Sequence, residues 1–428
     1  MEAQANTSAF PAPPPGLTAK PPLASAGAAL AKSAAAGAAA LSALWTFPAM
    51  LLSAFLVAWG AEAAEFLISQ GLALAALAWL QTLPEFAVEA VIAWEAGKAA
   101  ARMHLAVANL TGAIRLLVGV AWPMIYFVAA FFGRRTRGRL PTIVLEREHA
   151  IEVMGLLPPL LYFVVILLKR SISVVDAGVL VALYLAYLWF LLKVPPHDEE
   201  ELADAPAVSR WAYGLGGARR VLAIAGLFVV GGLLLYLTAA PFLESMLGIA
   251  ALLGVSDFVF VQWVAPFLSE FPEKVSAFYW AKRVDKAPMA LMNMVSSNIN
   301  QWTILAAMIP LVYGWSHAAA GGGWIAFRFD AEQQVEIALT LAQSLLAMLL
   351  LMEMTFDWWE AAGLFGLWLV QFVEPGWREP VTLLYLAWAA WVLLGAVTGR
   401  RPLRAPRVFL ETVRATRAAP PPKSSPRA

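Results

Sequence analysis

The sequence predicts an all-α polytopic membrane protein with two inverted five-helix repeats and one extra C-terminal helix. Three observations support this. Hydrophobic residues make up 61% of the 428-residue chain and charged residues only 14%, and the mean hydropathy is +0.70. About eleven apolar stretches are long enough to cross a bilayer. Polar landmarks of the first half also return in the second half at a nearly constant spacing. A soluble globular protein does not need so large an apolar fraction.

The apolar stretches divide the chain into two sets of spans on either side of a polar segment. The first set is expected at about 42–60, 71–95, 105–132, 152–168 and 174–192, and the second at about 221–247, 251–280, 287–314, 333–352, 356–373 and 381–398. We divide the chain into a disordered Ala/Pro-rich tail (1–41), in which Ala28–Ala40 is a candidate surface helix, a first repeat (42–193), a polar cytoplasmic linker (194–220), a second, inverted repeat (221–373), an extra helix (374–399) and a basic cytoplasmic tail (400–428).

The distribution of Lys and Arg in the loops predicts the orientation in the membrane. Basic residues gather after the third span (134–139), after the seventh (282–286) and in the tail from Arg400. With eleven spans these three regions fall on one side, which the positive-inside rule makes cytoplasmic. Lys169 and Arg170 fall on the opposite side and break the rule. We therefore expect a multi-pass protein of a prokaryotic-type plasma membrane with a cytoplasmic C-terminus.

Three pairs of landmarks recur at a similar spacing along the chain. The separation between Glu85 and Glu273 nearly equals the separation between Asn109 and Asn293. Asp176 and Glu360 each stand near the start of an apolar span, and the distance between them in the sequence is again the same. Such a recurrence indicates an internal repeat. Because each repeat contains five spans, an odd number, the two halves would have opposite orientations in the membrane.

Each half places a Pro-Glu pair inside an apolar span. The first reads Thr82-Leu83-Pro84-Glu85-Phe86 and the second Ser269-Glu270-Phe271-Pro272-Glu273. Proline has no backbone N–H and so frees the carbonyl four residues earlier. In hydrocarbon, a free carbonyl is tolerated only where protein or a water-filled cavity covers it. A carboxylate at that depth costs about 3 kcal/mol or more, so the combination predicts a cation site.

Further polar residues share helix faces with these acids. Helical spacing puts Thr82, Glu85 and Glu89 on one face of the second span. The same spacing puts Asn293, Ser297 and Gln301 on one face of the eighth. Carboxylate, amide and hydroxyl oxygens suit Ca²⁺, Na⁺ or H⁺ better than a soft transition metal. Hydrogen bonding between helices explains the second set equally well. The chain has no cysteine, which excludes thiolate metal sites and disulfides. It has only four histidines.

These motifs resemble the cation/Ca²⁺ exchanger superfamily, the sodium/calcium exchangers and their relatives. In that family each of two inverted repeats carries T-S-x-P-E and then G-N-x-x-G-S-N-x-x-(N/D). The resemblance covers about residues 42–373. It implies that Glu85 and Glu273 are the central cation-binding, metal-ligating glutamates. Thr82 and Glu270 fall at positions where the family has serine, Ser297 matches its serine, and Gln301 falls where it has a ligating Asn or Asp.

The first half departs from the family pattern. Ala113 stands where the family has serine, and Leu117 where it has the last ligating Asn. Arg115 brings a positive charge into the third span. Glu89 and Glu270 are additional acids, and we hypothesise that Arg115 or Lys274 neutralises one of them. Residues that could bind or tune a cation are therefore Asn109, Asn293, Glu89 and Arg115.

The resemblance implies a secondary antiporter that exchanges Ca²⁺ or a similar cation against Na⁺ by alternating access. Spans two, three, seven and eight would form the site, and spans one and six would slide past it. We expect no enzymatic activity, no catalytic residue and no cofactor. The expected partners are inorganic cations and the lipid bilayer, not nucleic acid.

Two alternatives remain open. One is a proton-coupled exchanger (Ca²⁺/H⁺ or Na⁺/H⁺), which the extra acids favour. The other is a non-transporting membrane protein with a degenerate exchanger fold, to which Leu117 and Arg115 point. The sequence does not determine the oligomeric state.

Overall fold

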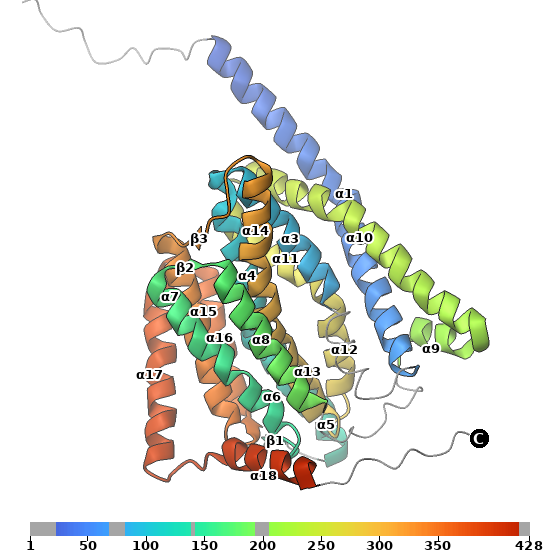
Figure 1. The fold of residues 1–428 in the computed structure, drawn as a ribbon, viewed down its shortest axis with the longest axis vertical. Helices are drawn as coiled ribbons and strands as arrows, with labels where there is room; N and C mark the ends of the chain where they lie inside the picture. The colour runs from blue at the N-terminus through green and yellow to red at the C-terminus, as the bar shows by residue number, and fades with distance from the viewer. Residues whose placement is uncertain (1–22, 68–81, 138–141, 193–204, 419–428) are drawn as a thin grey trace, which may run out of the picture.

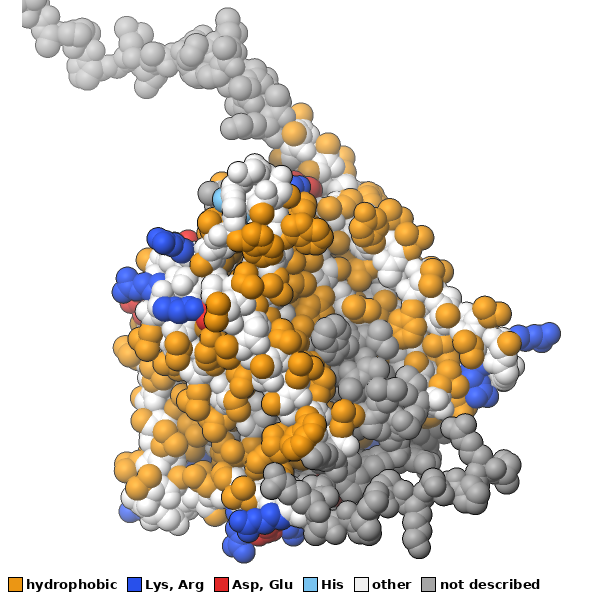
Figure 2. Space-filling model, viewed as in Figure 1, with side chains coloured by type: hydrophobic (Ala, Val, Ile, Leu, Met, Phe, Trp, Pro, Cys, Tyr) orange, Lys and Arg blue, Asp and Glu red, His pale blue; other side chains and the backbone are white. Residues whose placement is uncertain are grey.

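The computed structural model describes residues 23–67, 82–137, 142–192 and 205–418, which are almost entirely helical. Seven stretches in these ranges are long and apolar enough to cross a membrane: Ser33–Ala64, Met103–Arg134, Ala150–Lys169, Val174–Leu191, Gly217–Leu253, Ala331–Leu351 and Pro375–Val397. Figure 2 shows hydrophobic side chains over most of one face of the molecule, with Lys and Arg gathered near its edges. The protein is therefore an integral, multi-pass membrane protein, because an apolar surface of this extent is stable only in lipid.

Two sets of helices follow one another along the chain. The first half contains α1 (Leu23–Glu65), α3 (Leu83–Lys98), η1 (Ala100–Arg102), α4 (Met103–Leu116), η2 (Leu117–Ala121), α5 (Trp122–Arg137), α6 (Ala150–Gly155), α7 (Leu157–Lys169) and α8 (Val174–Leu191). The second half contains α9 (Ala207–Gly214), α10 (Gly217–Leu253), α11 (Asp257–Ser269), α12 (Phe271–Ala281), α13 (Ala287–Asn300), η4 (Gln301–Leu305), α14 (Ala306–Ala319), α15 (Ala331–Leu351) and α16 (Trp358–Val373). The chain ends with η5 (Pro375–Trp377), α17 (Arg378–Val397) and α18 (Arg404–Ala418).

Local features of the first half recur in the second half at one constant spacing in the sequence. The segments η2 and η4 are both π-helical, and each follows a 14-residue α-helix. Capping boxes open α8 and α16 at Ser173 and Asp357. Arg170 and Met354 have positive φ and are the two non-glycine residues with this conformation among the described ranges. Such uncommon features are expected to recur at one spacing where two segments of a chain have the same backbone conformation.

Two short strand pairs join the halves. β1 (Thr142–Val144) pairs with β4 (Thr355–Asp357), and β2 (Ser171–Ile172) pairs with β3 (Phe327–Arg328), both antiparallel. Each pair therefore takes one strand from each half of the chain.

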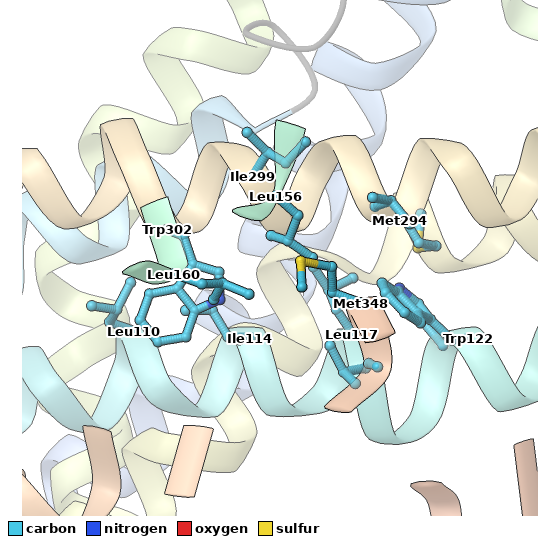
Figure 3. Close-up of a cluster of buried hydrophobic side chains, with 14 of the residues drawn as sticks. Leu110, Ile114, Leu117, Trp122, Leu156, Leu160, Met294, Ile299, Trp302 and Met348 are labelled. Carbon is cyan, nitrogen blue, oxygen red and sulfur yellow. The ribbon is translucent and has the colours of Figure 1, made fainter. Parts of the chain in front are cut away.

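A continuous apolar core holds α4 and η2 against α13 and η4. In Figure 3, Leu110 and Ile114 lie beside Trp302, and Leu156 lies beside Ile299. Leu160 and Met348 occupy the space between the two helices. The indole of Trp302 is fully buried and lies edge-on to Phe163, with 4.4 Å between ring centroids. Close packing of this kind fixes the relative positions of the two helices that carry the polar motifs.

The helices α1 and α10 pair along their length at one side of the body (Figure 1). Small residues allow the close approach: Gly231 packs against Ser53 and Val57, and Gly248 against the backbone of Ala36. One hydrogen bond, between the hydroxyls of Thr46 and Ser245 (2.9 Å), crosses the interface. Packing by small residues is typical of helix pairs in membranes.

Several predicted boundaries differ from the structure. α1 begins at Leu23, so residues 23–41 are helical and not part of a tail; residues 1–22 lie outside the described ranges. The linker region contains α9, and α10 starts four residues before 221. In the basic tail, α18 is an amphipathic helix that packs beside α6. Alanine-rich and amphipathic stretches form helices readily, and tertiary contacts stabilise them.

Candidate functional site

The predicted break in the second half lies at Glu270. α11 ends at Ser269, Glu270 has φ −96° and ψ 4°, and α12 begins at Phe271 with Pro272 in its first turn. Thr82 has nearly the same backbone conformation, φ −89° and ψ −1°, at the start of α3. Proline fits the first turn of a new helix, whereas inside a helix it removes a backbone hydrogen bond and kinks or breaks it. The residues just before Thr82 (68–81) lie outside the described part of the chain.

The two helix starts meet around Gln301. The side-chain amide of Gln301 donates to Glu85 Oε1 (3.0 Å) and to Glu270 Oε1 (2.9 Å). Gln301 and Glu85 come from different halves of the chain, and both are buried. The first residue of the π-helical segment η4 thus joins carboxylates of both motifs. Such π-segments are frequent at functional sites, because the extra residue redirects a side chain.

Two further hydrogen bonds complete this polar centre. Ser297 donates through its hydroxyl to Glu273 Oε2 (3.2 Å), and Asn300 donates through its amide to Thr82 Oγ1 (2.9 Å). The six residues predicted as the cation site, Thr82, Glu85, Glu270, Glu273, Ser297 and Gln301, therefore form one cluster. Asn300 was not predicted as a site residue, although its position three residues after Ser297 places it on a nearby face.

Lys274 lies inside the same cluster. Its ammonium group forms an ion pair with Glu270, one turn earlier, and both side chains are buried. Lys274 thus neutralises Glu270, one of the two extra acids, as we hypothesised for Lys274 or Arg115.

The other extra acid, Glu89, lies one turn beyond Glu85 on α3. It accepts a hydrogen bond from the amide of Asn109 (2.7 Å), and neither side chain is exposed to solvent. One oxygen of each side chain, Glu89 Oε1 and Asn109 Oδ1, has no hydrogen-bond partner among the residues that the structure describes. Asn293, the counterpart of Asn109, is half-buried and takes part in none of these bonds.

Arg115 points away from the cluster. Its guanidinium pairs with Glu336 of α15 and donates to Gln371 (2.6 Å). Glu336 also pairs with Arg378 (2.7 Å) and accepts from Gln262 (2.8 Å). Arg115 therefore does not neutralise Glu89 or Glu270, and the hypothesis is wrong for Arg115. Glu336 was missed because an acid near the start of an apolar span usually faces solvent.

A cavity approaches the cluster from one side. It has a volume of about 560 Å³ and lies between α1, α9 and α12, where Glu62, Arg210, Ser276 and Arg283 contribute to its lining. A smaller hollow lined by Ala58, Ser269, Pro272, Glu273 and Ser276 adjoins it. Glu273 thus borders a small hollow that shares Ala58, Pro272 and Ser276 with the lining of the larger cavity.

A known protein family matches most of the chain. The family model "Sodium/calcium exchanger protein" matches residues 38–193 and 223–373. The chain belongs to the sodium/calcium exchanger family. Members of this family are membrane antiporters of cations, so the protein is a cation exchanger.

Two solved structures illustrate the likeness. The H⁺/Ca²⁺ exchanger CAX is 30% identical, with a TM-score of 0.79 over 89% of this chain and 91% of that one. The sodium–calcium exchanger NCX_Mj, in a crystal soaked with 10 mM Na⁺ and 10 mM Sr²⁺, is 18% identical, with a TM-score of 0.51 over 79% of this chain and 98% of that one. The second likeness concerns the fold alone. No curated protein matches the chain.

Proposed function

We propose that this exchanger moves Ca²⁺ against H⁺ by alternating access at the cluster around Gln301. The observation that carries the proposal is the meeting of Glu85, Glu270 and Glu273 at two helix starts, with a single buried Lys among them. Carboxylates held in this way bind a hard divalent cation or, in its absence, protons. Competition of both ions for the same carboxylates couples the two fluxes.

Two features favour H⁺ over Na⁺ as the coupling ion, although the sequence motifs alone favoured Na⁺. Ala113 and Leu117 remove two oxygen ligands from the first half, and Gln301 presents its amide N–H groups to the carboxylates. A Na⁺ ion needs oxygen ligands, whereas a proton needs only one carboxylate. The similarity to CAX, described as an H⁺/Ca²⁺ exchanger, points the same way.

Na⁺/Ca²⁺ exchange is the second candidate. The family model carries that description, and Thr82, Ser297 and Asn300 supply further side-chain oxygens around the carboxylates.

The proposed architecture has eleven spans, five in each of two inverted repeats and one in α17. The recurrence of η2 and η4, the capping boxes and the paired strands supports it. On this topology the basic loop at 282–286 and the C-terminus are cytoplasmic. The cavity lined by Arg283 and Lys286 would then open toward the cytoplasm, and α1 and α10 would move past the fixed cluster to open the other side.

The test is ⁴⁵Ca²⁺ uptake into proteoliposomes under an outward H⁺ gradient, an outward Na⁺ gradient, or neither. Uptake should follow the H⁺ gradient and disappear in Glu273→Gln. The matched control is Glu95→Gln, which also removes one carboxylate but from an exposed pair with Lys98, and it should transport normally. Uptake driven only by the Na⁺ gradient would instead support Na⁺/Ca²⁺ exchange, the second candidate. Absence of uptake and of Ca²⁺ binding would support a degenerate, non-transporting protein.

A further inference from the structure

The outer face of α18 carries a stripe of alternating leucines and arginines. Leu403, directly before the helix, is followed by Arg407, Leu410 and Arg414 at intervals of four, three and four residues. Helical spacing places these residues on one face. The two leucines are 43% and 52% exposed, and Arg407 is 85% exposed. The α18 stripe thus presents apolar and cationic groups together on the outside of the protein.

The opposite face of α18 is held by the protein itself. Ala405 is fully buried, and Val408 and Phe409 pack against the apolar core. The rings of Phe409 and Phe190, at the end of α8, lie 5.5 Å apart between centroids. The backbone N–H of Ala405 donates to the carbonyl oxygen of Met352 (3.0 Å). These contacts fix the rotation of α18 about its axis, and they turn the stripe away from the protein.

The position of α18 is at the surface of the membrane. The span that includes α17 ends at Val397, and residues 398–403 connect it to α18. In Figure 1, α18 runs across the ends of the spanning helices and lies beside α6. Figure 2 shows Lys and Arg side chains gathered at this end of the molecule. An amphipathic helix placed in this way lies where the headgroups of a bilayer meet its acyl chains.

The charges of α18 are mostly positive. The helix contains four arginines and a single acid, Glu411. Glu411 pairs with Arg407 (2.9 Å) and with Arg147 of the loop before α6 (2.6 Å). The same loop also contains Glu146 and Glu148. The attraction for an anion therefore comes from the local arrangement of the arginines on α18 and not from the net charge of this end of the molecule.

We propose that the α18 stripe binds anionic phospholipids of the adjacent leaflet, with Arg407 and Arg414 on the phosphates and Leu403 and Leu410 among the acyl chains. A guanidinium matches the geometry of a phosphate, and the apolar stem of an arginine can lie along neighbouring leucines. A second copy of this chain is a poorer occupant, because it would bring another set of arginines to the same surface. The proposal is independent of which ions the protein exchanges.

The test measures which lipid gathers beside the stripe. The chain has no cysteine, so Leu410→Cys provides one site for a fluorophore. The labelled full chain is placed, one copy per disc, in nanodiscs of phosphatidylcholine and phosphatidylglycerol, in which either the neutral or the anionic lipid carries a nitroxide quencher. The ratio of the two quenching efficiencies gives the local enrichment of phosphatidylglycerol. One arginine at an anionic leaflet favours binding by about fivefold, so we expect a ratio of about five or more.

Removing the arginines should abolish this enrichment. In the triple variant Arg404→Gln, Arg407→Gln and Arg414→Gln, the ratio should fall to about one. Salt provides a second measurement on the unchanged stripe. At about 1 M salt the screening length is about 3 Å, so the ratio should fall there too. Thermal unfolding checks that the triple variant is folded, and the salt series tests the proposal even where that variant does not fold.

Two controls show that the enrichment belongs to α18. Arg170→Gln, Arg219→Gln and Arg328→Gln together remove the same charge from exposed positions on other elements, and they should leave the ratio at Leu410→Cys unchanged. A fluorophore on Leu253→Cys, an exposed leucine at the end of α10, should show a smaller ratio than one on α18.

Three results would overturn the proposal. The first is a ratio near one with all arginines of α18 present. The second is a ratio that high salt leaves unchanged. The third is an equal loss of enrichment in the α18 triple variant and in the control triple variant. A ratio near one together with the emission of a buried fluorophore would show that protein, such as a second copy of the chain, covers the stripe instead of lipid.

Discussion

Replacing Glu336 by Gln should destabilise the protein strongly, although the residue lies outside the cation cluster. Glu336 is fully buried and is the carboxylate partner of Arg115, which is itself only 1% exposed. Removing one member of a buried ion pair costs about 3–5 kcal/mol, because the other charge stays uncompensated. Arg378 adds little to this figure, since it is 14% exposed and keeps a second partner, Glu332 (3.0 Å).

The assay is thermal unfolding in detergent, followed by intrinsic fluorescence. A loss of 3–5 kcal/mol should lower the midpoint by roughly 3–10 °C in a chain of this size. The matched control, Glu332→Gln, removes a carboxylate from the same Arg378 at a side chain 56% exposed, and its midpoint should stay near that of wild type. Arg115→Met with Glu336→Leu removes both buried charges and should recover most of the loss. Equal midpoints for Glu336→Gln and Glu332→Gln would refute the reasoning.

Two further predictions concern close packing and the role of Glu89. Gly112→Ala should disrupt the contact of α4 with α11, because a Cβ there would lie 1.8 Å from the carbonyl oxygen of Gln262. Gly178→Ala, where a Cβ meets open space, is the control. Overpacking of this kind costs about 1–3 kcal/mol or more, so Gly112→Ala should unfold at lower temperature or express poorly. Glu89→Gln should keep H⁺-driven uptake, because Glu89 bonds to Asn109 and to none of the residues around Gln301 that the proposed function uses; a loss of uptake as complete as in Glu273→Gln would show that Glu89 takes part in transport.

The sequence was a good guide to the cluster because the residue types are costly in lipid. Glu85 and Glu273 inside apolar spans, each after a proline, have few explanations besides a cation site. Helical spacing then selected Ser297 and Gln301, and the structure brings both to the carboxylates. Their role as ligands stays a prediction.

The partner of Arg115 could not be predicted in the same way. Local spacing relates residues on one helix, whereas Arg115 and Glu336 lie far apart in the sequence and meet through the packing of α4 on α15. The start of α1 was predicted only in part. A helix at Ala28–Ala40 was a candidate, but its continuation into the first span depends on packing against α10, which the local sequence does not show. The coupling ion depends on small differences in ligand geometry that neither composition nor spacing determines.

The strand pairs β1–β4 and β2–β3 have a consequence for the origin of the chain. Val144 lies opposite Thr355, and their counterparts in the other halves, Arg328 and Ser171, lie opposite each other in the same register. Two separate copies of one ancestral half, related by a two-fold axis, would exchange strands in this reciprocal way. Fusion of two such copies into one polypeptide would leave these contacts unchanged. On that origin, the two strand pairs would be the former interface between the copies, now held within a single molecule, and each pair in the described residues joins a strand of one half to a strand of the other.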